Sequence, residues 1–371
     1  MSTTLTTEGE AYRNFINSID SEYSRTLYRQ IFPLFMKFCH IETYEAMLTE
    51  IQPVKKLEGI IRDYIIYLRE DRKLSPATVS LYTSCISHFY NMNDIVINWR
   101  KLKKFKGRYH GVVEDQPYTR EQIKTLIDNS HLRDRCAILL MASSGLRRGA
   151  LTGLRLKDLE KIAKYNLYKI TVYKKEQEQY ITYCTPECSR YIDRYLSWRT
   201  NLGEQLSPTS YLFRLGFDTT SNLHITSPKP YRAESIGHNI ADLLDRTGVR
   251  PRKQTRYART SLMACHGFRK FFHTECINHN MNPIYAEYLM GHKTGLTKSY
   301  FKPTDQELLE GTDQSRGYAA IISYLTIDAT SEENQRLREE LQTRAQQHTE
   351  EWELLRKEID QMRQKMGYQL L

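Results

Sequence analysis

The chain has 371 residues, enough for two domains of ordinary size, and 40% of them are apolar, which argues against a disordered protein. Its seven cysteines lack CxxC spacing, so the sequence predicts neither a disulfide framework nor a zinc cluster. No apolar run is as long as a membrane span, and the polar first residues are unlike a signal peptide, so we expect a cytoplasmic protein.

The positive charge is concentrated in the middle of the chain. Residues 1–117 hold 16 Lys and Arg against 14 Asp and Glu, residues 118–327 hold 31 against 20, and residues 328–371 hold 7 against 10. The net charges of these blocks are +2, +11 and −3, which make up the total of +10. A basic block of this kind suits a polyanionic partner such as DNA, although a solvated basic surface explains it equally well.

Residues 10–106 have the pattern of a small helical bundle, and we expect a first domain at residues 1–107. Apolar residues recur at spacings of three and four within 23–39 and 54–68. Ser75 followed by Pro76 is typical of a helix start, with serine as the N-cap and proline at the first helical position.

The first domain ends in a basic segment, WRKLKKFKGR at 99–108, in which six cations alternate with aromatic residues. Such a segment is suited to follow DNA phosphates, and it is equally typical of a helix end with lysines near the negative end of the helix dipole. Helical periodicity is lost after Gly107, so residues 108–118 are the predicted linker. The candidate DNA contacts in this segment are Arg100, Lys101, Lys103, Lys104 and Lys106.

A second domain is predicted at residues 119–327. Thr119 and Gln122 have the spacing of a capping box. Further on, a short helix bracketed by glycines carries Arg147 and Arg148.

Two β-type segments follow this short helix. Residues 167–173 and 180–185 are rich in β-branched and aromatic residues and flank the polar turn KKEQEQ. They predict a hairpin with Lys174 and Lys175 at its tip.

The rest of the second domain is expected to be helical at 188–201 and 305–325, with 203–260 as its least regular stretch. This stretch has cation-rich parts, and a basic loop against DNA or a mobile surface loop would account for them. The candidate DNA contacts of this domain are Arg148, Lys229, Arg232, Arg252, Lys253 and Arg256.

The residues with the clearest chemistry lie between Met263 and Thr304. His266, Arg269, His292 and Tyr300 provide two imidazoles, a fixed cation and a phenol. A phenol is able to attack phosphorus, a guanidinium to hold non-bridging oxygens, and imidazoles to donate hydrogen bonds or move protons. Such a set is able to cleave a phosphodiester without a metal or other cofactor.

His273, Cys276 and His279 also share a spacing that would place them on one helical face. A metal site is one interpretation. Because they lie in FFHTECINH, a segment typical of packing, we expect core and helix-surface roles instead, and predict no metal.

The last block, residues 328–371, has a heptad pattern in which apolar positions alternate at spacings of four and three. We expect a coiled-coil helix that joins protomers, with a helix folded back onto its own domain as the alternative.

In order and spacing, several segments resemble the tyrosine recombinases, also called phage integrases. SGLRRGALTGLRLKDL resembles the first conserved box of that family, and HGFRK with LMGHKTGLTKSYF resembles the second. TPEC and MGHKTG resemble integrases of archaeal mobile elements. The resemblance implies a mainly α fold with a small antiparallel β-hairpin or sheet (α+β), made of a helical DNA clamp and a catalytic domain.

The resemblance also implies a role for each site residue. Arg147 and Arg269 would clamp the scissile phosphate, and His266 and His292 would hydrogen-bond it or assist proton movement. Tyr300 would attack phosphorus and leave a 3′-phosphotyrosine. Lys174 would protonate the departing 5′ oxygen, with Lys175 as the alternative because the hairpin register is uncertain by one residue.

Two residues depart from the family pattern. The family usually has an acidic residue three positions after the first arginine, where this chain has Ala150. Its tyrosine commonly follows the last histidine by nine residues, which is Phe301 here, whereas Tyr300 follows by eight. Adjacent helical residues point about 100° apart, so the shift must be absorbed by the intervening loop.

The function implied is site-specific recombination of double-stranded DNA by a homo-tetramer near the nucleoid. Two alternatives stay open: a type IB topoisomerase, which uses similar chemistry as a monomer, and a catalytically inactive, sequence-specific DNA-binding relative.

Overall fold

The computed structural model describes residues 9–107, 115–174, 176–250, 260–292 and 300–328. The chain divides into two compact units, residues 1–112 and residues 113–371. None of the described helices is both long and apolar enough to cross a bilayer. The predicted heptad segment lies outside the described residues, apart from Asp328.

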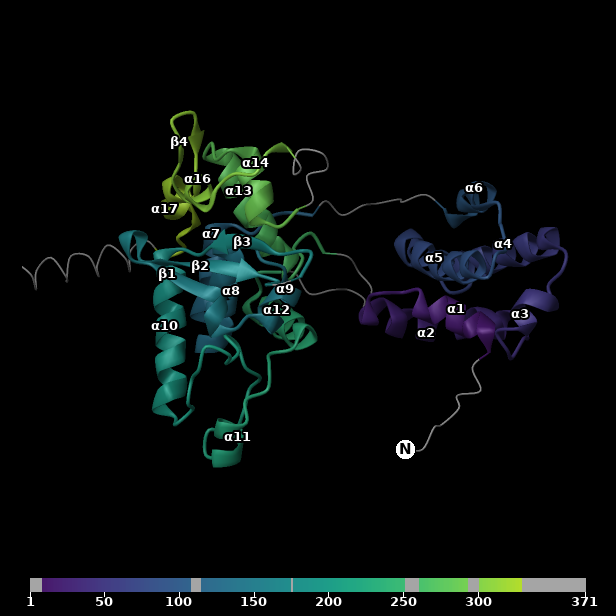
Figure 1. The fold of residues 1–371 in the computed structure, drawn as a ribbon, viewed down its shortest axis with the longest axis horizontal. Coiled ribbons are helices and arrows are strands. Elements are labelled where there is room, and N and C mark those ends of the chain that lie inside the picture. The colour runs from purple at the N-terminus through teal and green to yellow at the C-terminus, as the bar shows by residue number, and fades with distance from the viewer. Residues whose placement is uncertain (1–8, 108–114, 175, 251–259, 293–299, 329–371) are drawn as a thin grey trace, which may run out of the picture. The chain divides into compact units, whose positions relative to one another are not determined.

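The first unit is a helical bundle (Figure 1), and aromatic side chains pack in its core. Phe15, Phe32 and Phe89 are fully buried in its core, and the rings of Phe32 and Phe89 have centroids 4.2 Å apart. The Ser75 hydroxyl accepts a hydrogen bond from the Thr78 N–H at 3.2 Å, which confirms the predicted helix start. The elements are α1 (Glu10–Asn17), α2 (Glu22–Cys39), α3 (Ala46–Thr49), α4 (Val54–Glu70), α5 (Pro76–Met92), α6 (Trp99–Leu102) and the 3-10 helix η1 (Lys103–Lys106).

The second unit is organised around α8 (Leu132–Ser144), whose residues from Cys136 to Ser144 are all buried. A helix that is apolar on every side needs neighbours all round. Those neighbours include α7 (Arg120–Asp128), α10 (Pro186–Asn201) and α13 (His266–Asn278), and Figure 1 shows α8 in the middle of the unit. Thr119 and Gln122 form the predicted capping box at the start of α7.

A three-stranded antiparallel sheet with the order β1-β2-β3 packs beside α8. The predicted hairpin is confirmed as β2 (Leu167–Val172) and β3 (Tyr180–Tyr183). Pairing of Ile170 with Thr182 sets their register, and Leu167, Ile170 and Val172 face the core. The third strand, β1 (Leu159–Ile162), was not predicted.

The stretch 203–260, predicted to be the least regular of this unit, contains α11 (Asn222–Thr226) and the four-turn helix α12 (Ala233–Thr247). The prediction of one helical segment at 305–325 is wrong in part. The segment consists of α16 (Asp305–Glu310), the hairpin β4 (Gly311–Thr312) and β5 (Ser315–Arg316), the 3-10 helix η4 (Tyr318–Ile321) and α17 (Ile322–Leu325).

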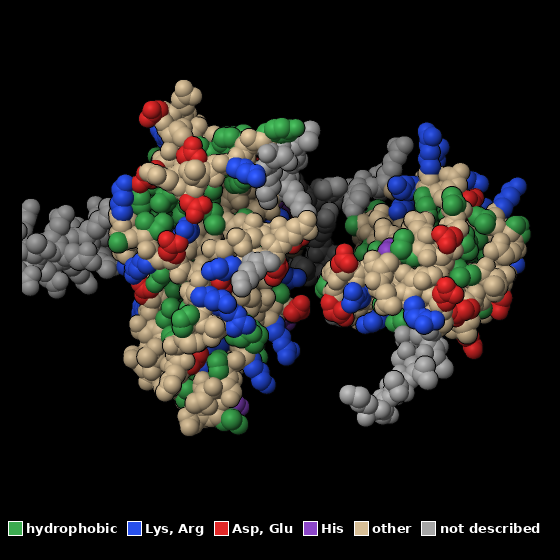
Figure 2. All heavy atoms as spheres, viewed as in Figure 1, with side chains coloured by type: hydrophobic (Ala, Val, Ile, Leu, Met, Phe, Trp, Pro, Cys, Tyr) green, Lys and Arg blue, Asp and Glu red, His purple; other side chains and the backbone are tan. Residues whose placement is uncertain are grey.

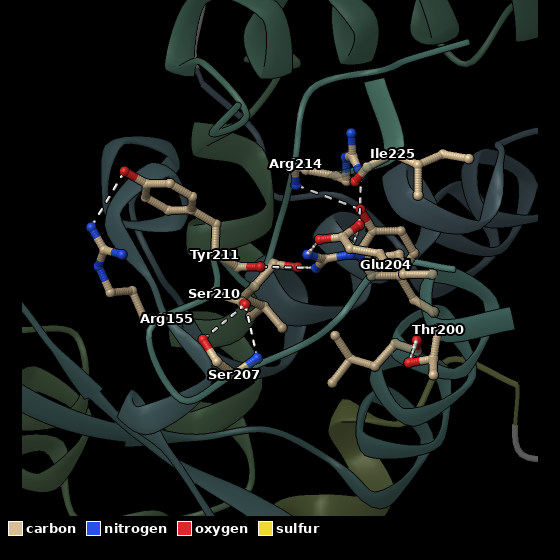
Figure 3. A network of polar contacts seen from close by, with 12 residues as sticks. Arg155, Thr200, Glu204, Ser207, Ser210, Tyr211, Arg214 and Ile225 are labelled. Carbon is tan, nitrogen blue, oxygen red and sulfur yellow. Dashed lines mark hydrogen bonds and ion pairs between the residues drawn. The ribbon is translucent and has the colours of Figure 1, made fainter. Parts of the chain in front are cut away.

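A buried ionic network fastens the loop after α10 to the rest of the unit (Figure 3). The Glu204 carboxylate accepts hydrogen bonds from Arg199 and Arg214, and all three side chains are at most 3% exposed. Arg199 also donates to the carbonyl oxygens of Tyr211 and Leu212 at 2.8 and 2.9 Å. Burial alone would raise the pKa of Glu204, but the hydrogen bonds and charges of the two arginines outweigh it and lower that pKa.

The same loop braces the segment that follows the short helix α9 (Arg148–Gly153). The Leu212 N–H donates to the Leu154 carbonyl at 2.8 Å, and the Leu156 N–H donates to the Ser210 carbonyl at 3.0 Å. The Arg155 guanidinium bonds the Tyr211 hydroxyl at 3.3 Å (Figure 3). The buried network therefore supports the segment at the end of α9, the helix for which Arg147 is the N-cap.

Candidate active site

Arg147 is placed by a turn that only glycine fits well. It is the N-cap of α9, two residues after Gly145, which ends α8 in the left-handed region at φ 63°. A Cβ on Gly145 would lie 2.6 Å from the Phe272 ring, so both the backbone conformation and the packing require glycine. The Arg147 side chain is exposed and makes no hydrogen bond or ion pair with another described residue.

Arg269, on the first turn of α13, is held in a fixed orientation at the centre of the site. It is 3% exposed, and its guanidinium donates to the carbonyl oxygens of Gly145 and Met290, the latter at 2.7 Å. A third bond joins its Nη2 to the His292 Nε2 at 2.6 Å. Burial, followed by the nearby charge of Arg147, lowers the pKa of Arg269 to about 10.

His292 follows α14 (Pro283–Leu289) after a second glycine turn, Gly291, at φ 63°. Its Nδ1 bonds the Glu287 Oε2, and the other carboxylate oxygen, Oε1, bonds the His273 Nε2 at 3.1 Å. The His292 backbone N–H donates to the Glu287 carbonyl at 3.0 Å, so this pair is held through both backbone and side chain.

His266 begins α13, one turn before Arg269. Burial, then the charges of Lys270 and Arg269, lower the pKa of His266, which favours the neutral imidazole. Lys270 donates to the Asp115 carbonyl at 3.0 Å and lies 3.4 Å from its carboxylate.

Four of the predicted catalytic residues line two adjoining cavities. Arg147, His266 and Arg269 line a cavity of about 350 Å³. His266, Arg269 and His292 line a second cavity of about 360 Å³. Because His266 and Arg269 line both cavities, the structure brings these four residues into one cationic site.

Lys174 lies outside this group. Its Nζ is 3.5 Å from the Lys157 carbonyl oxygen, and it lines a separate cavity of about 480 Å³ together with Tyr173 and Ala150. Ala150 is 3% exposed, and among the described residues no acidic side chain lines the cavity that holds Arg147. The alternative residue, Lys175, lies outside the described residues.

Tyr300 and Phe301 differ in how much of the side chain is exposed and in what the ring contacts. The Tyr300 side chain is 87% exposed, whereas Phe301 is 37% exposed and packs on α14. The Phe301 ring stacks on Tyr285, with centroids 6.3 Å apart, and meets Tyr288 edge-on at 6.5 Å. The structure thus places Phe301 in a packed position and leaves Tyr300 pointing into solvent.

The predicted DNA contacts that the structure describes are on the surface of their own units. Arg100, Lys101, Lys103 and Lys104 are exposed on α6 and η1, while Lys106 is half-buried and donates to the Ser80 hydroxyl. In the second unit Arg148, Lys229 and Arg232 are exposed. Figure 2 shows Lys and Arg side chains gathered in the middle of one face of this unit. Arg252, Lys253 and Arg256 lie outside the described residues.

Arg148 and Arg232 belong to elements that touch each other. A Cβ on Gly237 of α12 would lie 2.3 Å from an Nη of Arg148, so glycine at this position allows the guanidinium to rest on α12. Arg232 is the N-cap of the same helix. Arg148 and Gly237 both line the cavity that holds Arg147, so this basic surface borders the site.

The three residues considered as a metal cluster have other partners. His273 bonds Glu287, Cys276 is fully buried, and His279 pairs with Glu275 at 3.3 Å and stacks on Tyr324. Among the described residues, no group of three or more His, Cys, Asp or Glu side chains is arranged to hold a metal ion.

Two side chains near the site were missed from the sequence. Glu287 precedes His292 by five residues, a spacing that has no helical meaning because the turn at Gly291 intervenes. Tyr180 packs against Gly291, where a Cβ would lie 2.5 Å from its ring. Burial raises the pKa of Tyr180 to about 12, and the charges of Arg269 and Arg147 oppose that rise.

The fold is similar to that of solved integrases. The integrase of the Tn1549 transposon, in complex with a circular intermediate DNA, superposes with a TM-score of 0.54 at 16% identity and covers 79% of this chain and 94% of that one. The same integrase with transposon right end DNA gives 0.53 at 16% identity over the same shares. At these identities the likeness shows the fold.

The sequence comparisons give the family. The model of the phage integrase family matches residues 117–307, just over half of the chain. Tyrosine recombinase XerC from Leptospira interrogans serogroup Icterohaemorrhagiae serovar copenhageni is 25% identical over 205 residues, 51% of this chain. This chain spans 62% of the length of that relative. The chain belongs to the phage integrase family.

Proposed function

We propose that this chain is a site-specific DNA recombinase that breaks and rejoins strands through a 3′-phosphotyrosine intermediate. The observation that supports the proposal most directly is the shared site of Arg147, His266, Arg269 and His292, in which two guanidiniums border one pair of cavities. Fixed guanidiniums are well suited to the charge that develops on phosphate oxygens in a transition state.

In the proposed reaction the Tyr300 oxygen attacks phosphorus, and the bond to the 5′ oxygen breaks. Lys174, or Lys175, supplies the proton that the departing oxygen takes up. Arg147 and Arg269 hold the non-bridging oxygens. Rejoining is the reverse attack by a 5′ hydroxyl of another strand, so the phosphodiester bond energy is retained and no ATP is needed.

The basic surfaces fit double-stranded DNA as the partner. Residues 1–107 form the proposed DNA clamp with the cations of α6 and η1, residues 119–327 the catalytic domain, and residues 328–371 the oligomerisation helix. We propose a tetramer on two duplexes, associated with the nucleoid. The resemblance of TPEC and MGHKTG to integrases of archaeal mobile elements remains part of the proposal.

A DNA-binding relative that does not cleave is the second candidate. It is favoured by the packing of Phe301 on α14 and by Ala150, which leaves no carboxylate three residues after Arg147. Such a protein would bind the same sites and form no covalent adduct.

A covalent-trapping assay tests the proposal. The candidate site is prepared with a nick or a 5′-bridging sulfur so that the cut strand cannot rejoin, and is incubated with the full chain without divalent metal. We expect an adduct that survives denaturation with the wild type and is lost with Tyr300→Phe. Binding without any adduct would favour the second candidate.

A further inference from the structure

Glu287 is a carboxylate that reaches the phosphate-binding groups through His292. Its Oε2 bonds the His292 Nδ1, and the His292 Nε2 bonds Arg269 at 2.6 Å. The described polar partners of the Arg269 guanidinium include, besides His292, two carbonyl oxygens. A continuous path therefore runs from Arg269 through His292 to Glu287.

The direction of the bonds assigns the proton on His292. A guanidinium only donates, so the Nε2 of His292 accepts from Arg269 in this state. The imidazole is then neutral with its proton on Nδ1, and that proton is donated to Glu287. The tautomer is set by the carboxylate on one side and by the arginine on the other.

A phosphate bound at this site changes which protons His292 must carry. When a non-bridging oxygen takes the Arg269 N–H, the His292 Nε2 loses its donor and must itself carry a proton to hydrogen-bond the phosphate. A carboxylate on Nδ1 stabilises the resulting imidazolium, because opposite charges favour the charged form. Neutral glutamine at position 287 would still accept from Nδ1 but would lose this charge effect.

His273 also holds the Glu287 carboxylate in place. It comes from α13, and its Nε2 bonds the Oε1 of Glu287 at 3.1 Å, so the carboxylate is held from two helices. Glu287 is one-third exposed and His273 about two-fifths exposed, which keeps the pair in contact with solvent protons.

We infer that Glu287 is a positioning residue that sets the tautomer and charge of His292, and that it provides from α14 a carboxylate for a site that has Ala150 in place of the family's acidic residue. This inference rests on the proposed function. It differs from the family pattern because the carboxylate acts on His292 rather than beside Arg147.

Other titratable and charged groups line the same pair of cavities or lie beside them. Glu287 belongs to α14, and the remaining groups come from α13, β3, the start of α9 and the segment before α7: Arg269, Lys270, His266, His273, Tyr180, Arg147 and Asp115. Of the two described side chains that bond the His292 ring, Glu287 and Arg269, only Glu287 carries a negative charge. Removing the negative charge at position 287 is therefore the substitution that tests the inference.

The pH profile of single-turnover cleavage tests the inference. Glu287→Gln removes the negative charge beside the His292 Nδ1, so cleavage by the variant is expected to be about tenfold slower than by the wild type at pH 8 and about equal to it at pH 6. Glu287→Asp, which keeps the charge, should recover part of the rate at pH 8.

Glu275→Gln is the matched control. Glu275, on α13, pairs at 3.3 Å with His279, the C-cap of that helix, but lines neither cavity. Its profile should overlay the wild type. Equal loss at every pH with Glu287→Gln, or the same shift with Glu275→Gln, would overturn the inference.

A second readout does not depend on cleavage. The full chain is labelled with ¹⁵N-histidine, and the His292 signals are assigned by their loss in His292→Asn. The wild-type His292 imidazole should show the Nδ1–H tautomer. In Glu287→Gln its titration midpoint should be lower than in the wild type. An unchanged midpoint overturns the role of Glu287 even if the DNA is cleaved. A shifted midpoint with no adduct under any condition would refute the proposed recombinase instead.

Discussion

Phe301 stacks on Tyr285 with ring centroids 6.3 Å apart and ring planes 6° apart, while the adjacent Tyr300 is 87% exposed. Phe301 is not part of a described helix, and its ring packs on α14, whereas the exposed Tyr300 phenol is available for chemistry. The shifted spacing between His292 and the tyrosine is therefore matched by a difference in environment.

The first prediction separates these two roles. Phe301→Ala should reduce the free energy of unfolding by about 1–2 kcal/mol, because a partly buried ring no longer packs on α14. Tyr300→Phe should change it by less than about 0.5 kcal/mol, because the side chain is exposed. Urea unfolding measures both. A larger cost for Tyr300→Phe would mean that the phenol is packed.

Arg269→Lys is expected to weaken both the fold and the site. A lysine cannot reach the carbonyl oxygens of Gly145 and Met290 and His292 at once, so buried acceptors lose their partners at about 1–3 kcal/mol each. Denaturation should show a loss of roughly 2–3 kcal/mol. The exposed Arg147→Lys is the control, and it should leave stability nearly unchanged while still slowing covalent adduct formation.

Gly145→Ala should be destabilising by about 2 kcal/mol or more, since φ is 63° and the new Cβ would lie 2.6 Å from Phe272. Gly153→Ala is the matched control at the end of α9. A Cβ there meets nothing within 4 Å, so it should be neutral or stabilising by up to about 1 kcal/mol. Equal effects from the two substitutions would contradict the account of the turn before Arg147.

Glu204→Gln should cost about 3–5 kcal/mol at pH 7, because Arg199 and Arg214 would stay buried without a carboxylate. The lowered pKa of Glu204 also gives a pH dependence. Its stabilisation is complete above the unfolded-state pKa of about 4.3 and is lost as pH falls through the lower folded-state value. Unfolding at pH 7, 5 and 3 should therefore show a steeper acid loss in the wild type than in the variant.

A surface pair provides the comparison for that experiment. Glu160 lies 2.6 Å from Lys169 and is 67% exposed, so Glu160→Gln should cost less than about 1 kcal/mol. If Glu204→Gln reduced the free energy of unfolding no more than Glu160→Gln does, the buried network would not stabilise the loop after α10 as the structure indicates.

DNA affinity should depend on salt through the cations of α6 and η1. Replacing Lys101 and Lys104 by glutamine should reduce the slope of log affinity against log salt by about 1 for each phosphate that is no longer neutralised. Lys55 and Lys56, exposed on α4, offer the same change of charge in the same unit. An equal reduction with those two residues would assign the effect to net charge and not to this segment.

The sequence was a good guide where local chemistry decides the structure. Ser75 with Pro76 and Thr119 with Gln122 mark helix starts that the structure has. The β2–β3 hairpin was predicted because its side chains are β-branched or aromatic, whereas β1, with the charged sequence LEKI, carries almost no strand signal. The hairpin at Gly311 was missed because it depends on backbone packed against backbone, with Gly311 at φ 86°.

The site residues also divide into those that the sequence predicted and those that it did not. Residue types and order pointed to Arg147, His266, Arg269 and His292, which line adjoining cavities. Glu287 and His273 could not be predicted, because they meet across two helices and only the turn at Gly291 brings Glu287 to His292. The position of Lys174 likewise depends on the hairpin tip, whose register no sequence pattern specifies.

The central claim is that Tyr300, next to a packed Phe301, attacks DNA. The most direct measurement is to trap the adduct on a substrate that cannot rejoin, digest the protein and identify by mass spectrometry which of the 26 tyrosines carries the nucleotide. We predict a single modified residue, Tyr300, with a 3′-linked phosphate. A modification on any other tyrosine, or no modification on DNA that is fully bound, would contradict the account.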